Sequence, residues 1–428
     1  MTRWICVPIL VCSFLPAALA DWPAFLGGRQ RSSVTDFQLP LEWSPESGMV
    51  WQTPLSGYGQ SSPVIVGSRI FVTAIDGPMK ETNRVSCFDL ATGNKLWQHE
   101  SPSSLQVKND PYTSRAAPTP VADSSGVFAF FESGNLIALD NEGQVRWQRS
   151  LIDDYGKYEG KFGLGGSLAQ VDDRLFVLAD NDGPAYLAAI DKQSGKTIWK
   201  TDRTSRTAWS SPMIIPVDGT PQVVVSAAGS IDGYSVETGQ RLWTFDEVGG
   251  NTVASPVMVD DSRFLIGASP GRNGEASEGA RRSNLLMKIN KTDQGFEPEV
   301  VWINEKVTSS FGSPIAYQGH AYYTNRGGVV YCLDLATGET VYTARVEESN
   351  WATPIGVGDH VYFFGQHGVT SVLKTGDEEK IVTENTLWKP DGDGGPGGFA
   401  AEIQYGFAVI ENGFIIRTGS RLFRIGTP

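Results

Sequence analysis

Six residues of the chain have the types and spacing to form a binding surface. All are aromatic residues or an arginine, and each stands shortly before a strand-like run, in several cases three residues before a proline. The faces of aromatic rings hold flat groups and sugar rings, and a guanidinium stacks well on such a face. We therefore expect them to bind an extended peptide or a glycan. The set is Tyr58, Arg115, Phe162, Trp209, Phe311 and Trp351. An alternative stays open, in which the rings wedge between structural units and never reach solvent.

The sequence offers no pattern for a metal site or a catalytic nucleophile. Cys87 and Cys332 occupy the same position of two separate repeats, so they are not expected to come within disulfide distance. We predict that both are buried free thiols. Metal-ligand spacing is missing from the four histidines, which are His99, His320, His360 and His367. We therefore assign no metal and no catalytic residue.

A repeat supplies the elements that must position these side chains. Val85 to Trp97 reads V-S-C-F-D-L-A-T-G-N-K-L-W, and it returns at Val330 to Tyr342 as V-Y-C-L-D-L-A-T-G-E-T-V-Y. An apolar run of period two predicts a strand, Asp and Thr-Gly predict a tight turn, and a second strand follows. Glycine fits this turn because the turn needs a positive φ. Because a lone hairpin is marginally stable in water, the hairpins must stack on one another.

An aromatic residue closes each copy, and these residues recur at intervals of about 40 to 60 residues, the period of propeller blades. They are Trp51, Trp97, Trp147, Trp199, Trp243, Trp302, Tyr342 and Trp388. A second signature, Ser/Thr-Pro-apolar, begins another hairpin in most intervals, as at Ser211-Pro212-Met213, so each unit has four strands.

The end of the chain indicates how the array closes. Residues 406–425 supply only three strands, and the strand Met49 to Thr53 has no partner nearby. We predict that this strand completes the last blade, which removes the open edges of a linear array. The predicted fold class is all-β, an eight-bladed β-propeller of four-stranded antiparallel blades. The residues before Met49 are interpreted as a polar lead-in.

Charge and the first residues indicate the compartment. A net charge of -13 argues against nucleic acid as a partner, because phosphates require basic patches. Arg3, the apolar run Ile5 to Leu15 and the small residues Ala18-Leu19-Ala20 predict a signal peptide over residues 1–20. A single propeller domain is then expected over 21–428, exported to the periplasm or beyond the cell. No later apolar run is long enough to span a membrane. We expect a monomer.

The repeated pattern Ala/Cys-x-Asp-x-x-Thr/Ser-Gly-x-x-x-Trp resembles the tryptophan-docking repeat of the PQQ-binding-like β-propellers. That family includes quinoprotein alcohol dehydrogenases and the propeller subunit of the outer-membrane assembly machinery. The resemblance covers nearly all of the mature chain and implies tryptophans between neighbouring blades. The quinoproteins use two adjacent cysteines, a bound Ca²⁺ and an Asp base, and this chain has no adjacent cysteines. The resemblance therefore implies the scaffold and carries over no catalytic residue.

Three functional hypotheses follow. The favoured one is a non-catalytic, exported propeller without a cofactor, which binds protein segments or cell-surface polymer in the cell envelope. The alternative is a quinoprotein-type oxidoreductase, which would require PQQ with Ca²⁺. A further alternative is a polysaccharide-active enzyme that works as a lyase or hydrolase, for which no residue pair is nominated.

Overall fold

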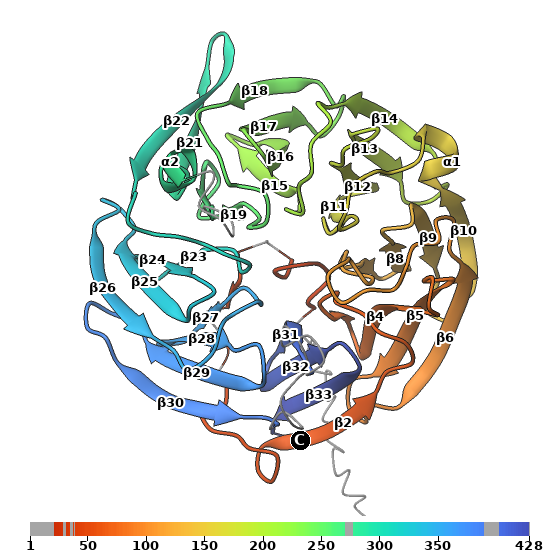
Figure 1. Cartoon of the computed structure of the whole chain (residues 1–428), viewed down its shortest axis with the longest axis horizontal. Coiled ribbons are helices and arrows are strands. Elements are labelled where there is room, and N and C mark those ends of the chain that lie inside the picture. Colours follow the sequence, from red (N-terminus) through yellow and green to blue (C-terminus); the bar gives the residue numbers. More distant parts are fainter. Residues whose placement is uncertain are drawn as a thin grey trace, which may run out of the picture.

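The computed structural model describes residues 21–28, 31–34, 37, 39–269, 277–388 and 402–427. These residues form a closed ring of eight sheets around a central axis (Figure 1). Two short helices interrupt the strands, α1 (Leu151–Tyr155) and α2 (Ser277–Arg281). The all-β, eight-bladed prediction is confirmed, because every sheet contains four antiparallel strands in the predicted order.

The blades follow one another along the chain, each beginning with its innermost strand. Blade 1 contains β3 (Val64–Val66), β4 (Arg69–Asp76), β5 (Thr82–Asp89) and β6 (Lys95–Pro102), and blade 2 contains β7 (Val121–Asp123), β8 (Gly126–Phe130), β9 (Asn135–Leu139) and β10 (Val145–Ser150). Blade 3 contains β11 (Ala169–Val171), β12 (Arg174–Ala179), β13 (Tyr186–Asp191) and β14 (Thr197–Asp202), and blade 4 contains β15 (Met213–Val217), β16 (Thr220–Ala227), β17 (Ser230–Ser235) and β18 (Arg241–Phe245). Blade 5 contains β19 (Val257–Met258), β20 (Arg263–Ile266), β21 (Leu285–Thr292) and β22 (Gly295–Ile303). Blade 6 contains β23 (Ile315–Tyr317), β24 (His320–Thr324), β25 (Val329–Asp334) and β26 (Thr340–Arg345), and blade 7 contains β27 (Ile355–Val357), β28 (His360–Phe364), β29 (Val369–Lys374) and β30 (Ile381–Thr386).

Blade 8 combines a strand from the N-terminal part of the chain with the last three strands. It contains β31 (Gln404–Ile410), β32 (Gly413–Thr418) and β33 (Arg421–Gly426), and its outer strand is β2 (Met49–Pro54). β2 pairs antiparallel with β33, with Trp51 opposite Arg424. The predicted closure by the strand around Trp51 is confirmed. It leaves neither end of the ring with an unpaired strand edge.

The hydrophobic core lies between the sheets. Each cluster of buried apolar side chains in the described chain draws on two or three neighbouring blades, with Val121 of blade 2 and Leu175 of blade 3 in one cluster as an example. Because each blade packs its face against the next blade, the burial of these apolar side chains stabilises the ring as a whole. Cys87 and Cys332 are buried in separate blades as free cysteines, as predicted.

Five tryptophans each link their own blade to the next with one geometry. The indole Nε1 of Trp147, for example, donates to the carbonyl of Lys192 at 2.9 Å, and a Cβ built on Gly195 would lie 2.6 Å from the indole ring. Gly195 has a φ of 70° in the turn of the next blade, so only glycine fits against the ring there. Trp51, Trp97, Trp199 and Trp302 make the same contacts with Leu90, Asn141, Val236 and Leu335.

The other three aromatic anchors make different contacts. Trp243 donates to Gln222 in its own blade at 2.7 Å and stacks on Phe264, because β21 and β22 form a long hairpin without the Asp-Thr-Gly turn. Trp388 lies beyond the end of β30 and stacks on Phe423 of the next blade. Thr383 holds the equivalent position within β30, beside the bulge that every outermost strand pair carries. Tyr342 stands opposite Cys332 in the regular position.

A series of hydroxyl groups, one from each of blades 2 to 7, explains the Ser/Thr-Pro signature. The hydroxyl of the Ser or Thr in one blade accepts a hydrogen bond from the backbone N–H of the equivalent residue in the preceding blade, as Ser211 accepts from Ser167 at 3.0 Å. The pairs run from Ser62 to Thr119, Thr119 to Ser167, Ser167 to Ser211, Ser211 to Ser255, Ser255 to Ser313 and Ser313 to Thr353. Each bond satisfies a buried backbone donor at the start of an inner strand.

The residues before β2 are more than a lead-in, and this corrects the sequence interpretation. Trp22 exchanges two 2.8 Å backbone hydrogen bonds with Ile65 of blade 1, and Ser32 accepts from the N–H of Gly356 in blade 7. β1 (Ser33–Val34) pairs parallel with β27 and adds a fifth strand to that sheet. We call residues 22–28 and 31–34 the crossing segment, because they run across the centre of the ring (red in Figure 1). The central opening is therefore occupied.

Candidate functional site

The six predicted residues all lie in connections that enter the innermost strand of a blade. The inner strands all begin at the same end of the central channel, and we call this end the mouth. Because the six connections belong to different blades, their side chains come from several sides of the ring. They form two groups, which is a finer arrangement than the single surface expected from the sequence.

The first group is centred on Tyr58. The guanidinium carbon of Arg115 lies 3.6 Å from the centroid of the Tyr58 ring, and the Tyr58 hydroxyl lies 2.9 Å from that of Tyr405. Arg115 Nη2 donates to the Tyr405 hydroxyl at 3.4 Å. We call Tyr58, Arg115 and Tyr405 the tyrosine–arginine cluster. Two backbone hydrogen bonds to Ile75 fix Tyr58.

Two further rings extend this group along the mouth. Trp351 meets Tyr405 edge to face, with ring centroids 6.1 Å apart, and Phe311 lies 4.8 Å from Trp351. Phe311 is 38% exposed, so this row of rings reaches solvent at its end. The interpretation that all the rings wedge between blades therefore does not hold for Phe311.

The second group is a pair of rings from blades 3 and 4. Phe162 and Trp209 meet edge to face at 5.8 Å, and Trp209 Nε1 donates to the carbonyl of Gly163 at 2.9 Å. Phe162 is 37% exposed, and Lys161 Nζ lies 5.3 Å from its centroid. The hydrogen bond holds the indole in place, while the phenyl ring remains available to a ligand.

Tyr405 was missed by the sequence analysis. It lies at the start of β31, where the register shifts between Gln404 and Gly406, so the chain carries a β-bulge at this position. Bulges commonly redirect a side chain. Blade 8 has no Ser/Thr-Pro signature, and so its entry residue had no marker in the sequence.

Arg417 lies beneath the tyrosine–arginine cluster and is fully buried. It donates to the carbonyls of Ser61 and Thr73 and to the Ser61 hydroxyl. No carboxylate of the described residues is within ion-pair distance of it. Burial lowers the pKa of Arg417 to about 9, which leaves the guanidinium charged at neutral pH.

Tyr58, which stacks beside the Arg115 guanidinium, stays neutral. Burial, with the neighbouring Tyr405, raises the pKa of Tyr58 above its ordinary value, although Arg115 and Arg417 act in the opposite direction. Neither arginine therefore gains a counter-charge from the Tyr58 hydroxyl.

A buried ion pair lies near Arg115. Lys80 Nζ is 3.6 Å from Glu132 Oε1, and both side chains are at most 5% exposed. Burial lowers the pKa of Lys80 and raises that of Glu132, since both charges lose water. Glu132 also accepts from the backbone N–H of Ala116, which follows Arg115. This carboxylate is thus engaged by its own partners and does not neutralise Arg115.

The crossing segment forms the floor of the mouth. A small cavity of about 60 Å³ lies between Trp22, Phe25 and Leu26 of this segment and the rings of Phe311, Trp351 and Tyr405. The site is therefore a shallow surface above a closed channel, suited to a side chain rather than to a large buried ligand.

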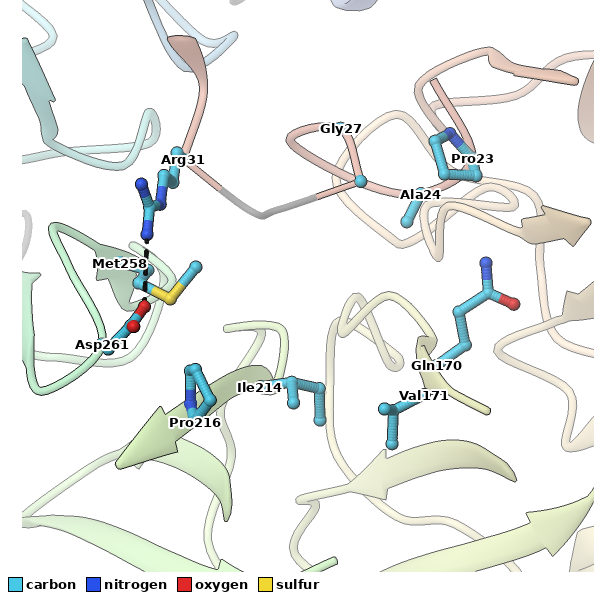
Figure 2. A pocket seen from close by; sticks show the side chains of 11 residues that line it. Pro23, Ala24, Gly27, Arg31, Gln170, Val171, Ile214, Pro216, Met258 and Asp261 are labelled. Carbon is cyan, nitrogen blue, oxygen red and sulfur yellow. Dashed lines mark ion pairs between the residues drawn. The ribbon is translucent and has the colours of Figure 1, made fainter. Parts of the chain in front are cut away.

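A larger cavity of about 310 Å³ lies at the opposite end of the channel (Figure 2). Pro23, Ala24 and Gly27 line one side, and the ends of the inner strands of blades 3 to 5 line the other. Arg31 and Asp261 form an ion pair at 3.7 Å on one side of it. Its remaining lining is mostly apolar and contains no aromatic ring.

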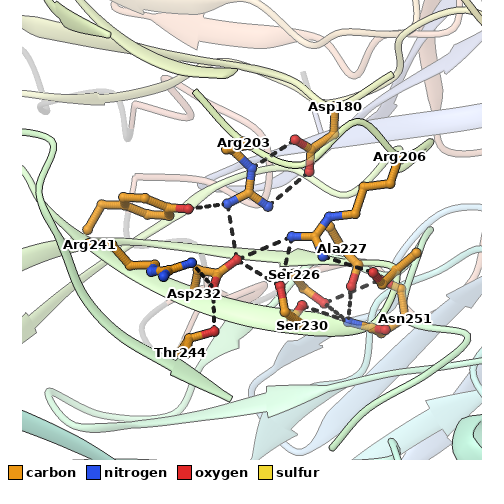
Figure 3. Close-up of polar contacts among 12 residues, drawn as sticks. Asp180, Arg203, Arg206, Ser226, Ala227, Ser230, Asp232, Arg241, Thr244 and Asn251 are labelled. Carbon is orange, nitrogen blue, oxygen red and sulfur yellow. Dashed lines mark hydrogen bonds and ion pairs between the residues drawn. The ribbon is translucent and has the colours of Figure 1, made fainter. Parts of the chain in front are cut away.

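The densest group of buried charges stands between blades 3 and 4 and serves the fold (Figure 3). Arg203 donates to both oxygens of Asp180 and to Asp232, and all three side chains are at most 3% exposed. Arg206 and Thr244 also donate to Asp232. Since every carboxylate here has its cation, the network connects two blades and leaves no group for a substrate.

Two further observations concern only the described part of the chain. It contains no cluster of three or more His, Cys, Asp or Glu residues able to hold a metal ion. None of its helices has the length and apolar character needed to cross a bilayer.

Comparison with known proteins agrees with this architecture. A family model described as outer membrane protein assembly factor BamB matches residues 17–162, 154–275 and 290–399. The chain belongs to this family. The tryptophan contacts and the eight blades described above are therefore features of a BamB-family propeller, which confirms the resemblance seen in the sequence.

Similar curated proteins match part of the chain. BamB of Burkholderia pseudomallei is 25% identical over 226 residues, which cover 50% of this chain and 52% of that protein. A polyvinylalcohol dehydrogenase of Pseudomonas sp is 24% identical over 280 residues, covering 54% of this chain and 39% of the dehydrogenase. The match thus spans about half the length of the first of these relatives and less of the second.

Solved structures show the same fold. BamB from Moraxella catarrhalis aligns with a TM-score of 0.61 and 17% identity, covering 89% of this chain and 97% of that chain. A computationally designed protein, Ika8, aligns with a TM-score of 0.57 and 12% identity over 86% of this chain and 97% of its own. At these identities the likeness concerns the fold alone.

Proposed function

We propose that this protein is a non-catalytic binding module of the cell envelope, which acts as a single copy and holds an extended segment of a partner protein across its mouth. The observation that carries the proposal is the exposure of Phe162 and Phe311, each more than a third accessible although each contacts a tryptophan. Exposed aromatic rings that neighbouring side chains hold in place are common anchors of protein interfaces.

Family membership supports a protein partner. The family model and the relative from Burkholderia pseudomallei are both described as outer membrane protein assembly factors. We therefore propose an envelope location, in agreement with the signal peptide predicted over residues 1–20, which lies outside the described residues. Aromatic rings also hold sugars, so a glycan partner remains the competing hypothesis for the same surface.

We also propose that the function requires no PQQ, although one relative is a polyvinylalcohol dehydrogenase. PQQ is a flat tricyclic tricarboxylate, and it needs an aromatic-lined slot of several hundred Å³. The mouth cavity of about 60 Å³ is too small, and the cavity of about 310 Å³ offers no ring for stacking. The described residues thus do not fit this cofactor. Dye reduction with alcohols or sugars after addition of PQQ and Ca²⁺ would contradict the proposal.

Site-specific photo-crosslinking in cells tests the binding function. A photoreactive amino acid is placed at Phe162 or Phe311, and in a control at Leu96, which is 50% exposed on the outer strand β6. We expect discrete adducts from the two mouth positions and none from Leu96. Their digestion by a protease would identify a protein partner, whereas digestion by glycosidases alone would favour the glycan. Equal labelling from Leu96, or no adduct from the mouth, would refute the proposal.

A further inference from the structure

The mouth contains positive charge that the described residues do not neutralise. Arg115 and Arg417 both lie at the junction of blades 8, 1 and 2, and neither has a carboxylate within 4.0 Å among the residues that the structure describes. The protein as a whole is acidic, with a net charge of -13. A buried cation is costly unless it is paired, so two unpaired guanidinium groups at one junction require an explanation.

Their donors are only partly used. Arg115 is 8% exposed, and its Nη2 donates to Tyr405 while its Nε has no partner within the described chain. Its Nη1 donates no hydrogen bond to a described residue. A guanidinium has five N–H donors in a planar fork that matches a carboxylate. Stacking on Tyr58 fixes the orientation of this fork before any ligand arrives.

The surroundings select an acidic group beside an apolar one. The Tyr405 ring connects Arg115 to Trp351 and Phe311, so an anion at Arg115 lies next to a row of exposed and half-buried rings. The Tyr58 hydroxyl remains neutral, so it can donate a hydrogen bond to an anion but supplies no negative charge in its place. Arg417 adds its field from beneath, in a site where burial weakens screening by water.

We infer that the tyrosine–arginine cluster is a carboxylate subsite, and that the segment held at the mouth carries an Asp or Glu side chain next to an aromatic or large aliphatic residue. The inference rests on the proposed function, since it names the chemistry of the same surface. It commits to a side-chain carboxylate within an extended protein segment. A free chain terminus is a different source of the same group, which the test distinguishes.

The test uses an array of random 12-residue peptides, blocked at both ends, probed with the labelled full-length protein. We expect binders enriched in Asp or Glu beside an aromatic or aliphatic residue. Changing that acid to its amide in the selected peptides should weaken binding about tenfold, the usual size of one charge-assisted hydrogen bond. The effect should diminish with added salt.

Variants locate the subsite. Arg115→Gln should bind the acidic peptides about tenfold more weakly and should bind the amide versions as the parent protein does. Arg241→Gln, the same change on the outer strand β18, should leave both unaffected. Arg115→Lys keeps the charge but loses the planar fork, and we expect intermediate affinity. Thermal unfolding of each variant verifies its fold, and the acid-to-amide comparison on the unmodified protein needs no variant.

The outcomes separate the two proposals. If Phe311→Ala abolishes binding while acidic and amide peptides bind alike, the mouth binds protein segments and the carboxylate subsite is refuted. If peptides with a free C-terminus bind and blocked acidic ones do not, the side-chain assignment is wrong. If no binder depends on Phe311, the proposed function fails, and the inference fails with it.

Discussion

Replacing Gly195 by alanine tests whether the tryptophan contacts hold the blades together. Gly195 has a φ of 70°, and an added Cβ would lie 2.6 Å from Cδ2 and 2.7 Å from Cε3 of Trp147. Gly219 provides a matched control, because its φ is 73° and its added Cβ would meet nothing within 4 Å. The two substitutions thus share the backbone effect, and only one of them collides with a ring.

The magnitudes follow from these two terms. Alanine in the left-handed region costs about 1 to 2 kcal/mol, so Gly219→Ala should lower the free energy of unfolding by about that amount. Crowding a well-packed contact costs a further 1 to 3 kcal/mol or so. We therefore expect about 3 kcal/mol for Gly195→Ala, about twice the effect of the control.

Chemical denaturation followed by tryptophan fluorescence and circular dichroism measures both variants, with the midpoint shift compared at equal slope. A double-mutant cycle with Trp147→Ala isolates the ring contact, since Gly195→Ala should then cost no more than Gly219→Ala. Equal costs of the two glycine variants in the parent protein would refute the idea that the ring meets the turn closely. So would an unchanged Gly195 penalty after Trp147 is removed.

Two further predictions concern the contacts between blades. Ser211→Ala removes the acceptor for the buried N–H of Ser167 and should lower the free energy of unfolding by about 1 to 3 kcal/mol. Ser211→Thr should be nearly neutral, because threonine fills this position in two other blades. Urea denaturation distinguishes the two variants, and equal losses of stability would contradict this role of the hydroxyl group. Asp232→Asn should cost about 3 kcal/mol near pH 7, because it weakens a buried ion pair with Arg203. Although burial opposes it, hydrogen bonding and the arginines lower the pKa of Asp232, so the stabilising effect is present above the ordinary value near 4 and is lost as the pH falls through the depressed pKa. The stability gap between parent and variant should close in acid, and a gap independent of pH would refute the assignment.

The repeated elements were predictable because each copy carries its own local signal. The Asp-x-x-Thr-Gly turn and the closing aromatic residue indicated hairpins, and their number and spacing indicated eight blades closed by the strand around Trp51. Trp388 shows the limit of this reasoning, since it fits the spacing but lies beyond β30, where Thr383 holds the regular position. Spacing alone does not reveal which side of a bulge a residue occupies.

The site was only partly predictable, because its assembly depends on contacts between distant segments. Four of the predicted residues lie within one row of contacts, namely Tyr58, Arg115, Trp351 and Phe311. Tyr405 joins them, and its position on a bulge has no sequence signature. The crossing segment was also missed. It has neither periodicity nor repeats, and it is held by backbone hydrogen bonds whose partners lie in blades 1 and 7.

Pairing of β2 with β33 has a consequence for how the protein matures. During synthesis the strand at residues 49–54 emerges early, whereas its partner at residues 421–426 is made after the strands of the other seven blades, so blade 8 forms only after those blades have been produced. Joining such remote segments is entropically slow. Until β2 and β33 pair, their edges are available to other chains. The risk of aggregation is therefore greatest late, just before the ring closes.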